Sequence, residues 1–170
     1  TAEKMGKNPG YFLVTLSKRK YLDKKIITYY SKPIKSIVSN FLRWHAKETE
    51  VQEALLFSIY INNQLIHFCN VHLSWPVSPR VRIEQLTNLY EQLNLENTII
   101  SGDLNTFGGL FYYNFLTALF FGYKPKDIFI NERKWLDQQI SKVDLQNPFR
   151  GSASYTSLPI NAQLDHVLIP

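Results

Sequence analysis

Two neighbouring apolar segments joined by only two residues place the strongest limit on how this chain can fold. The first segment covers residues 54–61, the second covers residues 64–72, and Asn62 and Asn63 stand between them. Asparagine tolerates the positive φ angles that a two-residue turn requires, so the pattern predicts a β-hairpin. His72 then lies at the far end of the second strand, with Asn70 on the same face, because side chains alternate along a strand.

The remaining segments alternate between the periods of helices and strands. Apolar residues at helical spacing predict an amphipathic helix over residues 78–95, with Ser78 as its N-cap and Pro79 in its first turn. The other expected elements are strands at 11–16, 26–30, 97–101 and 163–169 and helices at 110–121 and 135–142. This order predicts an α/β (α+β) fold, in which helices cover the outer face of a mixed sheet.

Length and composition describe an ordinary globular domain. The 170 residues contain no repeat or linker, so we expect residues 1–170 to form a single domain. Apolar residues make up 45% of the chain, but no apolar run is long enough for a membrane span. The single cysteine, Cys69, excludes an intrachain disulfide and is expected to be a buried small hydrophobe. A cytoplasmic location is favoured, while the loss of an N-terminal signal and the oligomeric state stay open.

The net charge of +5 is gathered near the N-terminus. Residues 18–35 contain seven lysines and arginines, against Asp23 as the one acid. Such a run attracts polyanions, and Lys18, Arg19 and Lys20 are candidate substrate-binding residues. A lysine-rich hairpin that is merely solvated explains the same run, so both interpretations stay open.

The stretch Gly102-Asp103-Leu104-Asn105 is the clearest sign of chemistry, because it follows an apolar strand directly. On an extended backbone, Asp103 and Asn105 turn to the same side. A carboxylate next to a carboxamide suits a hydrated Mg²⁺ ion or a water directed at a phosphate. The structural alternative is an ordinary turn in which the Asp and Asn side chains bond their own backbone.

Three motifs, in this order, resemble the endonuclease/exonuclease/phosphatase family, which includes deoxyribonuclease I. They lie in residues 68–75 around His72, in residues 99–106 around Asp103, and in residues 163–170 around Asp165. Two further stretches resemble the family: Arg82-Ile83-Glu84-Gln85-Leu86 its Arg-x-x-Gln-Leu helix, and Gly10 to Ser17 its Gly-x-x-x-x-x-Leu-Ser strand. The resemblance implies two mixed sheets packed face to face, with helices on the outer faces, in a deoxyribonuclease I-like four-layer sandwich. It also implies an active site at one rim, where strand ends meet.

The same resemblance implies hydrolysis of a phosphoric ester by direct attack of water on phosphorus, with Mg²⁺ or alternatively Mn²⁺ as cofactor. His72 is expected to contact the phosphate as an acid or hydrogen-bond donor, and Asp103 to orient or deprotonate the water. Asn105 is expected to bind the phosphate or, with Asp103, the metal ion. Asp165 is expected to hold the histidine in its productive tautomer. Two further candidates carry less weight, and they are Asn70 and His166.

The chain departs from the family pattern at both ends. Glu3 is the only acidic residue before Gly10 and stands too close to it to match the main metal-ligating Glu, and no Ser-Asp-His segment follows Asp165. We therefore expect an internal fragment whose activity belongs to a longer parent chain or needs a complementing segment. The basic charge favours nucleic acid over phospholipid or inositol phosphate as substrate. The alternative function is a catalytically inactive polyanion-binding module of the same fold.

Overall fold

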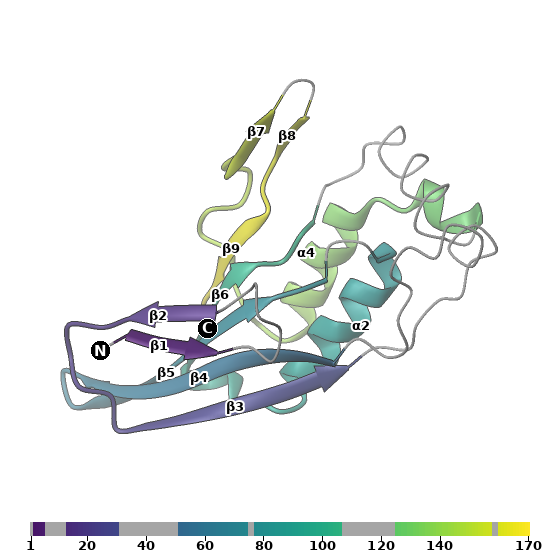
Figure 1. The fold of residues 1–170 in the computed structure, drawn as a ribbon. Coiled ribbons are helices and arrows are strands. Elements are labelled where there is room, and N and C mark those ends of the chain that lie inside the picture. Colours follow the sequence, from purple (N-terminus) through teal and green to yellow (C-terminus); the bar gives the residue numbers. More distant parts are fainter. Residues whose placement is uncertain (1, 6–12, 31–50, 75–76, 107–124, 158–159) are drawn as a thin grey trace.

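A computed structural model describes most of the chain (Figure 1). The described residues are 2–5, 13–30, 51–74, 77–106, 125–157 and 160–170. The expected helix at 110–121 and the start of the expected strand at 11–16 lie outside the described residues.

The centre of the fold is a five-stranded mixed sheet with the order β3-β4-β5-β6-β9. Its strands are β3 (Asp23–Tyr30), β4 (Val51–Ile61), β5 (Gln64–His72), β6 (Thr98–Asp103) and β9 (Asp165–Leu168). The β5–β6 pair is parallel, whereas the other three pairs are antiparallel. The predicted hairpin is confirmed as β4 and β5, and its turn residues Asn62 and Asn63 have φ angles of 49° and 64°.

Two helices cover one face of this sheet (Figure 1). They are α2 (Pro79–Tyr90) and α4 (Glu132–Lys142), and two short 3-10 helices, η1 (Leu95–Asn97) and η2 (Pro125–Phe129), precede β6 and α4. Ser78 occupies the N-cap position of α2 as predicted, but its side chain caps no backbone N–H. The helix ends before the predicted residue 95, because the chain turns ahead of η1. No helix in the described part of the chain is long and apolar enough to cross a membrane.

The core fills the space between the helices and the sheet. Leu86 and Leu89 of α2 and Leu136 of α4 are at most 2% exposed and belong to one cluster with the sheet residues. Burial of each such side chain contributes roughly 1.5 to 3 kcal/mol. Cys69 lies in the same cluster as expected, and burial raises the pKa of its thiol to about 12.

The other face of the sheet carries a two-stranded ribbon made of β1 (Ala2–Met5) and β2 (Leu13–Leu16) (Figure 1). The Asn70 amide on β5 donates a hydrogen bond to the Thr15 hydroxyl on β2, with an N···O distance of 3.1 Å. A second ribbon consists of β7 (Tyr155–Ser157) and β8 (Ile160–Ala162). The described residues thus form one large mixed sheet and two ribbons, and the second large sheet of the expected sandwich is not among them.

A buried ion pair joins the two helices. Arg82 Nε lies 2.6 Å from Glu132 Oε1, and both side chains are at most 1% exposed. The Arg82 guanidinium also donates to the Val77 carbonyl oxygen at 2.7 Å. Removal of one member of such a pair leaves an uncompensated buried charge, so the pair fixes the relative position of α2 and α4.

Gly102 lets β6 lie close against β5. Its φ angle is +143°, and a Cβ atom at this position would stand 1.9 Å from the Val71 carbonyl oxygen. A side chain of any size therefore requires the two strands to separate or the backbone to shift.

Substitution of Gly102 by alanine is expected to reduce the free energy of unfolding by roughly 2 to 4 kcal/mol, because strain and a backbone clash act together. Gly151→Ala is the matched control: Gly151 has a φ of +90° but no heavy atom within 4 Å of the added Cβ. Urea unfolding of both variants measures the difference. Equal losses in the two variants would show that the contact with Val71 is unimportant.

Candidate active site

Three chemistry-bearing residues lie side by side across three neighbouring strands. The parallel register of β5 and β6 pairs His72 with Asp103, and the antiparallel register of β6 and β9 pairs Asp103 with Asp165. Residues paired across a sheet project from the same face. The structure therefore brings the predicted His72, Asp103 and Asp165 together at the ends of their strands, on the sheet face that also bears Asn70.

His72 and Asp103 form the closest contact in this row. The distance between His72 Nε2 and Asp103 Oδ2 is 3.9 Å, and the side chains are 46% and 34% exposed. This separation is too long for a hydrogen bond but within ion-pair range. Both groups are half-exposed, so solvent and a ligand can reach them.

The pKa of the Asp103 carboxyl is raised above its ordinary value, chiefly by burial and also by the Asp165 carboxylate. The backbone N–H of Asn105 and the charges of His72 and Arg82 act in the opposite direction. The net effect makes this carboxylate a better proton acceptor than a solvent-exposed aspartate.

Asn105 departs from the expected geometry. The strand ends at Asp103 and Asn105 has a φ of +51°, so the prediction of a continuing extended backbone is wrong. Its backbone N–H donates to Asp103 Oδ1 at 2.8 Å, which is the turn anticipated as the structural alternative. Its side-chain amide donates to the Leu73 carbonyl oxygen at 2.7 Å, and Asn105 is only 4% exposed. The carboxamide is thus held between the chain segments that follow His72 and Asp103.

Asp165 is exposed and lies next to Asp103 rather than next to His72. Two strand spacings separate the backbones of Asp165 and His72, which is roughly 10 Å. Within the described ranges, the carboxylate at ion-pair distance from the imidazole belongs to Asp103. The role of Asp165 in orienting the histidine therefore stays a prediction.

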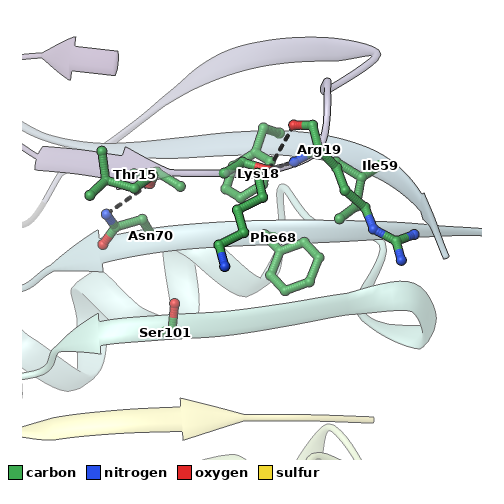
Figure 2. Close-up of a pocket in the computed structure, with 10 residues that line it drawn as sticks. Thr15, Lys18, Arg19, Ile59, Phe68, Asn70 and Ser101 are labelled. Carbon is green, nitrogen blue, oxygen red and sulfur yellow. Dashed lines mark hydrogen bonds between the residues drawn. The ribbon is translucent and has the colours of Figure 1, made fainter. Parts of the chain in front are cut away.

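A hollow of about 450 Å³ lies on the same sheet face (Figure 2). Asn70 and Ser101, which precede His72 and Asp103 by two residues, line it together with Phe68, Lys18 and Arg19. The Lys18 amine reaches into the space between Asn70 and Phe68 (Figure 2). Arg19 Nη1 donates to a backbone carbonyl of β4, that of Tyr60, at 3.2 Å. Lys20, the third cationic candidate, is exposed and does not line the hollow.

His166 lies on the opposite face of β9 from Asp165 and is 4% exposed. The Asn147 amide faces its Nδ1 at 2.9 Å, and the Thr106 hydroxyl and Gln163 carbonyl face its Nε2 at 2.8 and 3.1 Å. If Asn147 donates to Nδ1, the single proton of the neutral ring sits on Nε2. Burial lowers the pKa of this imidazole to about 4. These contacts give His166 a structural role in joining β9 to two loops.

Gln85 and Ser74 lie near the site, although the sequence assigns neither of them a chemical role. Gln85 of α2 is fully buried, and its carboxamide makes two hydrogen bonds to Ser74, two residues after His72. The Arg-x-x-Gln-Leu pattern located this helix, but nothing in the linear sequence indicates that Gln85 reaches Ser74.

The oxygen atoms of Asp103, Asn105 and Asp165 are of the kind that Mg²⁺ prefers. Among the described residues, no group of three or more His, Cys, Asp and Glu side chains is placed to hold a metal ion. Mg²⁺ is commonly bound through one or two carboxylates, with waters and substrate phosphates completing its shell. The oxygen atoms present here fit binding of this kind, in which the protein supplies only part of the metal shell. A cation there would relieve the repulsion between Asp103 and Asp165.

Replacement of His166 by Gln should make the protein less sensitive to acid. The unfolded histidine binds a proton near pH 6.5 and the folded one near pH 4, so the wild-type protein loses stability as the pH falls between these values. The full loss is about 3 kcal/mol. Urea unfolding at pH 7 and pH 4 should show a smaller difference for His166→Gln than for wild type. The same difference in both proteins would contradict the assignment.

Comparison with protein-family models finds no match, and no curated protein matches the sequence. Several solved structures are similar. An endonuclease/exonuclease/phosphatase family protein from Leptotrichia buccalis C-1013-b aligns with 99% of this chain and 58% of its own, at 11% identity and a TM-score of 0.53.

Two further structures align less well. The human Nocturnin catalytic domain with bound sulfate aligns with 91% of this chain and 49% of its own, at 14% identity and a TM-score of 0.48. ANGEL2, described as a 2′,3′-cyclic phosphatase, aligns with 99% of this chain and 62% of its own, at 13% identity and a TM-score of 0.49. The chain thus spans about half to three-fifths of the length of these proteins. On the alignment with the Leptotrichia protein, the chain has the fold of the endonuclease/exonuclease/phosphatase family.

Proposed function

We propose that this chain forms part of a Mg²⁺-dependent phosphoester hydrolase of the endonuclease/exonuclease/phosphatase family. The observation that carries the proposal is the register that aligns His72, Asp103 and Asp165 across β5, β6 and β9. The three sequence motifs that contain these residues are far apart in the chain, yet their polar side chains lie on one face of one sheet. Residues with only structural roles would not require three such side chains to align on one face of the sheet.

The fuller fold that we propose is the two-sheet sandwich, with the β1–β2 ribbon as the beginning of the second sheet. The ribbon already lies against the face of the large sheet opposite the helices, where the Asn70–Thr15 hydrogen bond joins the two layers (Figure 1). In this arrangement the row of site residues lies at the rim, where both sheets end.

In the proposed reaction a water molecule attacks phosphorus directly, without a covalent enzyme intermediate. Asp103 accepts the proton of that water, which agrees with the raised pKa of its carboxyl. His72 donates a hydrogen bond or a proton to a phosphate oxygen through its exposed imidazole. Asn105 holds the phosphate or the metal shell through its fixed carboxamide, and Asp165 adds negative charge beside Asp103.

Asp103 and Asn105 are the residues that would hold the metal ion, with Mn²⁺ as an alternative to Mg²⁺. When bound, the ion would neutralise the negative charge that develops on the phosphoryl oxygens. No residue of 1–170 matches the main metal-ligating Glu of the family, so Asp103 and Asn105 are the ligands that we propose from this chain.

Nucleic acid is the substrate class that we favour over phospholipid and inositol phosphate. Lys18 and Arg19 line the hollow beside Asn70, and their charge attracts a polyanion toward the site. Lys20 adds exposed positive charge to the same loop.

Asp103→Asn is expected to lower the rate of phosphoester hydrolysis by roughly 10²- to 10⁴-fold, because the amide cannot accept the proton of the water. The fold should stay intact, since an asparagine oxygen can still accept the Asn105 backbone N–H. Asp23→Asn, which changes an exposed carboxylate on the far edge strand, is the control with unchanged activity. Turnover and unfolding are measured in the full natural chain, and near-wild-type turnover in Asp103→Asn would overturn the assignment.

A metal and salt titration separates the enzyme from a polyanion-binding module. For the enzyme, hydrolysis of oligonucleotides requires Mg²⁺ and stops on chelation. For the binding module, oligonucleotides associate without hydrolysis, and the logarithm of the affinity falls linearly with the logarithm of the salt concentration. Salt-sensitive binding with no Mg²⁺-dependent hydrolysis in the full chain would favour the module.

A further inference from the structure

One buried side chain of α2, that of Gln85, holds the segment that follows His72. The Ser74 backbone N–H donates to Gln85 Oε1 at 3.2 Å, and Gln85 Nε2 donates to the Ser74 hydroxyl at 2.9 Å. Gln85 is fully buried and Ser74 is 6% exposed. Both ends of the Gln85 carboxamide therefore act on one residue, at a distance of 11 positions along the chain.

The same segment is bonded to the chain that follows Asp103. The Leu73 backbone N–H donates to the Asp103 carbonyl oxygen at 2.9 Å, and the Leu73 carbonyl oxygen accepts the Asn105 side-chain amide at 2.7 Å. Asn105 in turn donates its backbone N–H to Asp103 Oδ1. Gln85 is thus connected to Asn105 and Asp103 by hydrogen bonds to Ser74 and from Leu73, two residues that are consecutive in the chain.

We propose that Gln85 is a positioning residue that fixes His72 and the Asn105 carboxamide for catalysis, an inference that rests on the proposed function. Its hydrogen bonds to Ser74 act on these two residues through the Leu73–Ser74 segment. Loss of its hydrogen bonds frees the Leu73–Ser74 segment, and with it the carbonyl oxygen that holds the Asn105 amide. Buried polar groups of this kind orient a site because an unpaired alternative is costly.

The test is Gln85→Met, which keeps an unbranched side chain of similar length and removes the two hydrogen bonds to Ser74. Turnover (kcat) in the full natural chain should fall roughly ten- to a hundred-fold, the range found when supporting partners of site residues are removed, with KM nearly unchanged. In the NMR spectrum, exchange of the Ser74 N–H should become roughly tenfold faster. The side-chain NH₂ signals of Asn105 should shift.

Leu89→Ala is the matched control, because Leu89 is a fully buried residue of the same helix that makes no hydrogen bond to the Leu73–Ser74 segment. It should lower stability without moving the Asn105 NH₂ signals or kcat. If Gln85→Met does not fold, Ser74→Ala serves instead, since it removes only the hydroxyl that accepts from Gln85 Nε2. A smaller change of the same kind is then expected.

Unchanged Ser74 and Asn105 signals in Gln85→Met would overturn the inference, whatever the activity. Changed Ser74 and Asn105 signals with an unchanged kcat would also overturn it, because the hydrogen bonds of Gln85 would then serve stability alone. Failure of the proposed function is distinguishable, since the wild-type chain itself would then hydrolyse no phosphoester. In that case the side-chain NH₂ signals of Asn105 and the ring-proton signals of His72 decide whether Gln85 orders these two groups. Both sets of signals must change in Gln85→Met but not in Leu89→Ala.

Discussion

The parallel pairing of β5 with β6 is the constraint on which the rest of the site depends. It sets His72 opposite Asp103, and Gly102 permits it because a Cβ atom there would meet the Val71 carbonyl oxygen. A shift of the register by one residue would turn one of the two side chains toward the helices, since side chains alternate along a strand. The hydrophobic cluster prevents this shift, because it requires Cys69 and Val71 of β5 and Ile100 of β6 to face α2 and α4.

A layer of buried polar groups supports the strand ends from the helix side. Arg82 pairs with Glu132, Gln85 holds Ser74, and Asn105 bonds to Leu73, all at positions that are at most 6% exposed. Such groups are expensive to bury without partners, so each contact selects one arrangement of the chain. These buried contacts hold in place the strand ends that carry the half-exposed His72 and Asp103. A site that must keep a defined geometry needs such support.

Much of the fold follows from local patterns. The hairpin was predictable because two asparagines satisfy a turn that few other residues tolerate, and α2 because its apolar residues repeat at helical spacing. The same reasoning failed at Asn105, where Asp103 accepts its N–H and the backbone turns into the left-handed region instead of continuing the strand. The sequence also does not predict the strand at residues 2–5 that pairs with β2, because four residues are too few to show the alternation of apolar and polar side chains.

The order of amino acids alone indicates which residues are candidates for the chemistry, because it places carboxylate, carboxamide and imidazole groups at the predicted strand ends. It also determined the strand and helix periods that place His72 and Asp103 at those ends. Three features emerge only in the folded chain: Asp103 rather than Asp165 stands beside the imidazole, His166 is buried among Thr106, Gln163 and Asn147, and Gln85 reaches Ser74. Strand order and buried hydrogen bonds join residues that are far apart in the chain, and no local pattern records such pairings.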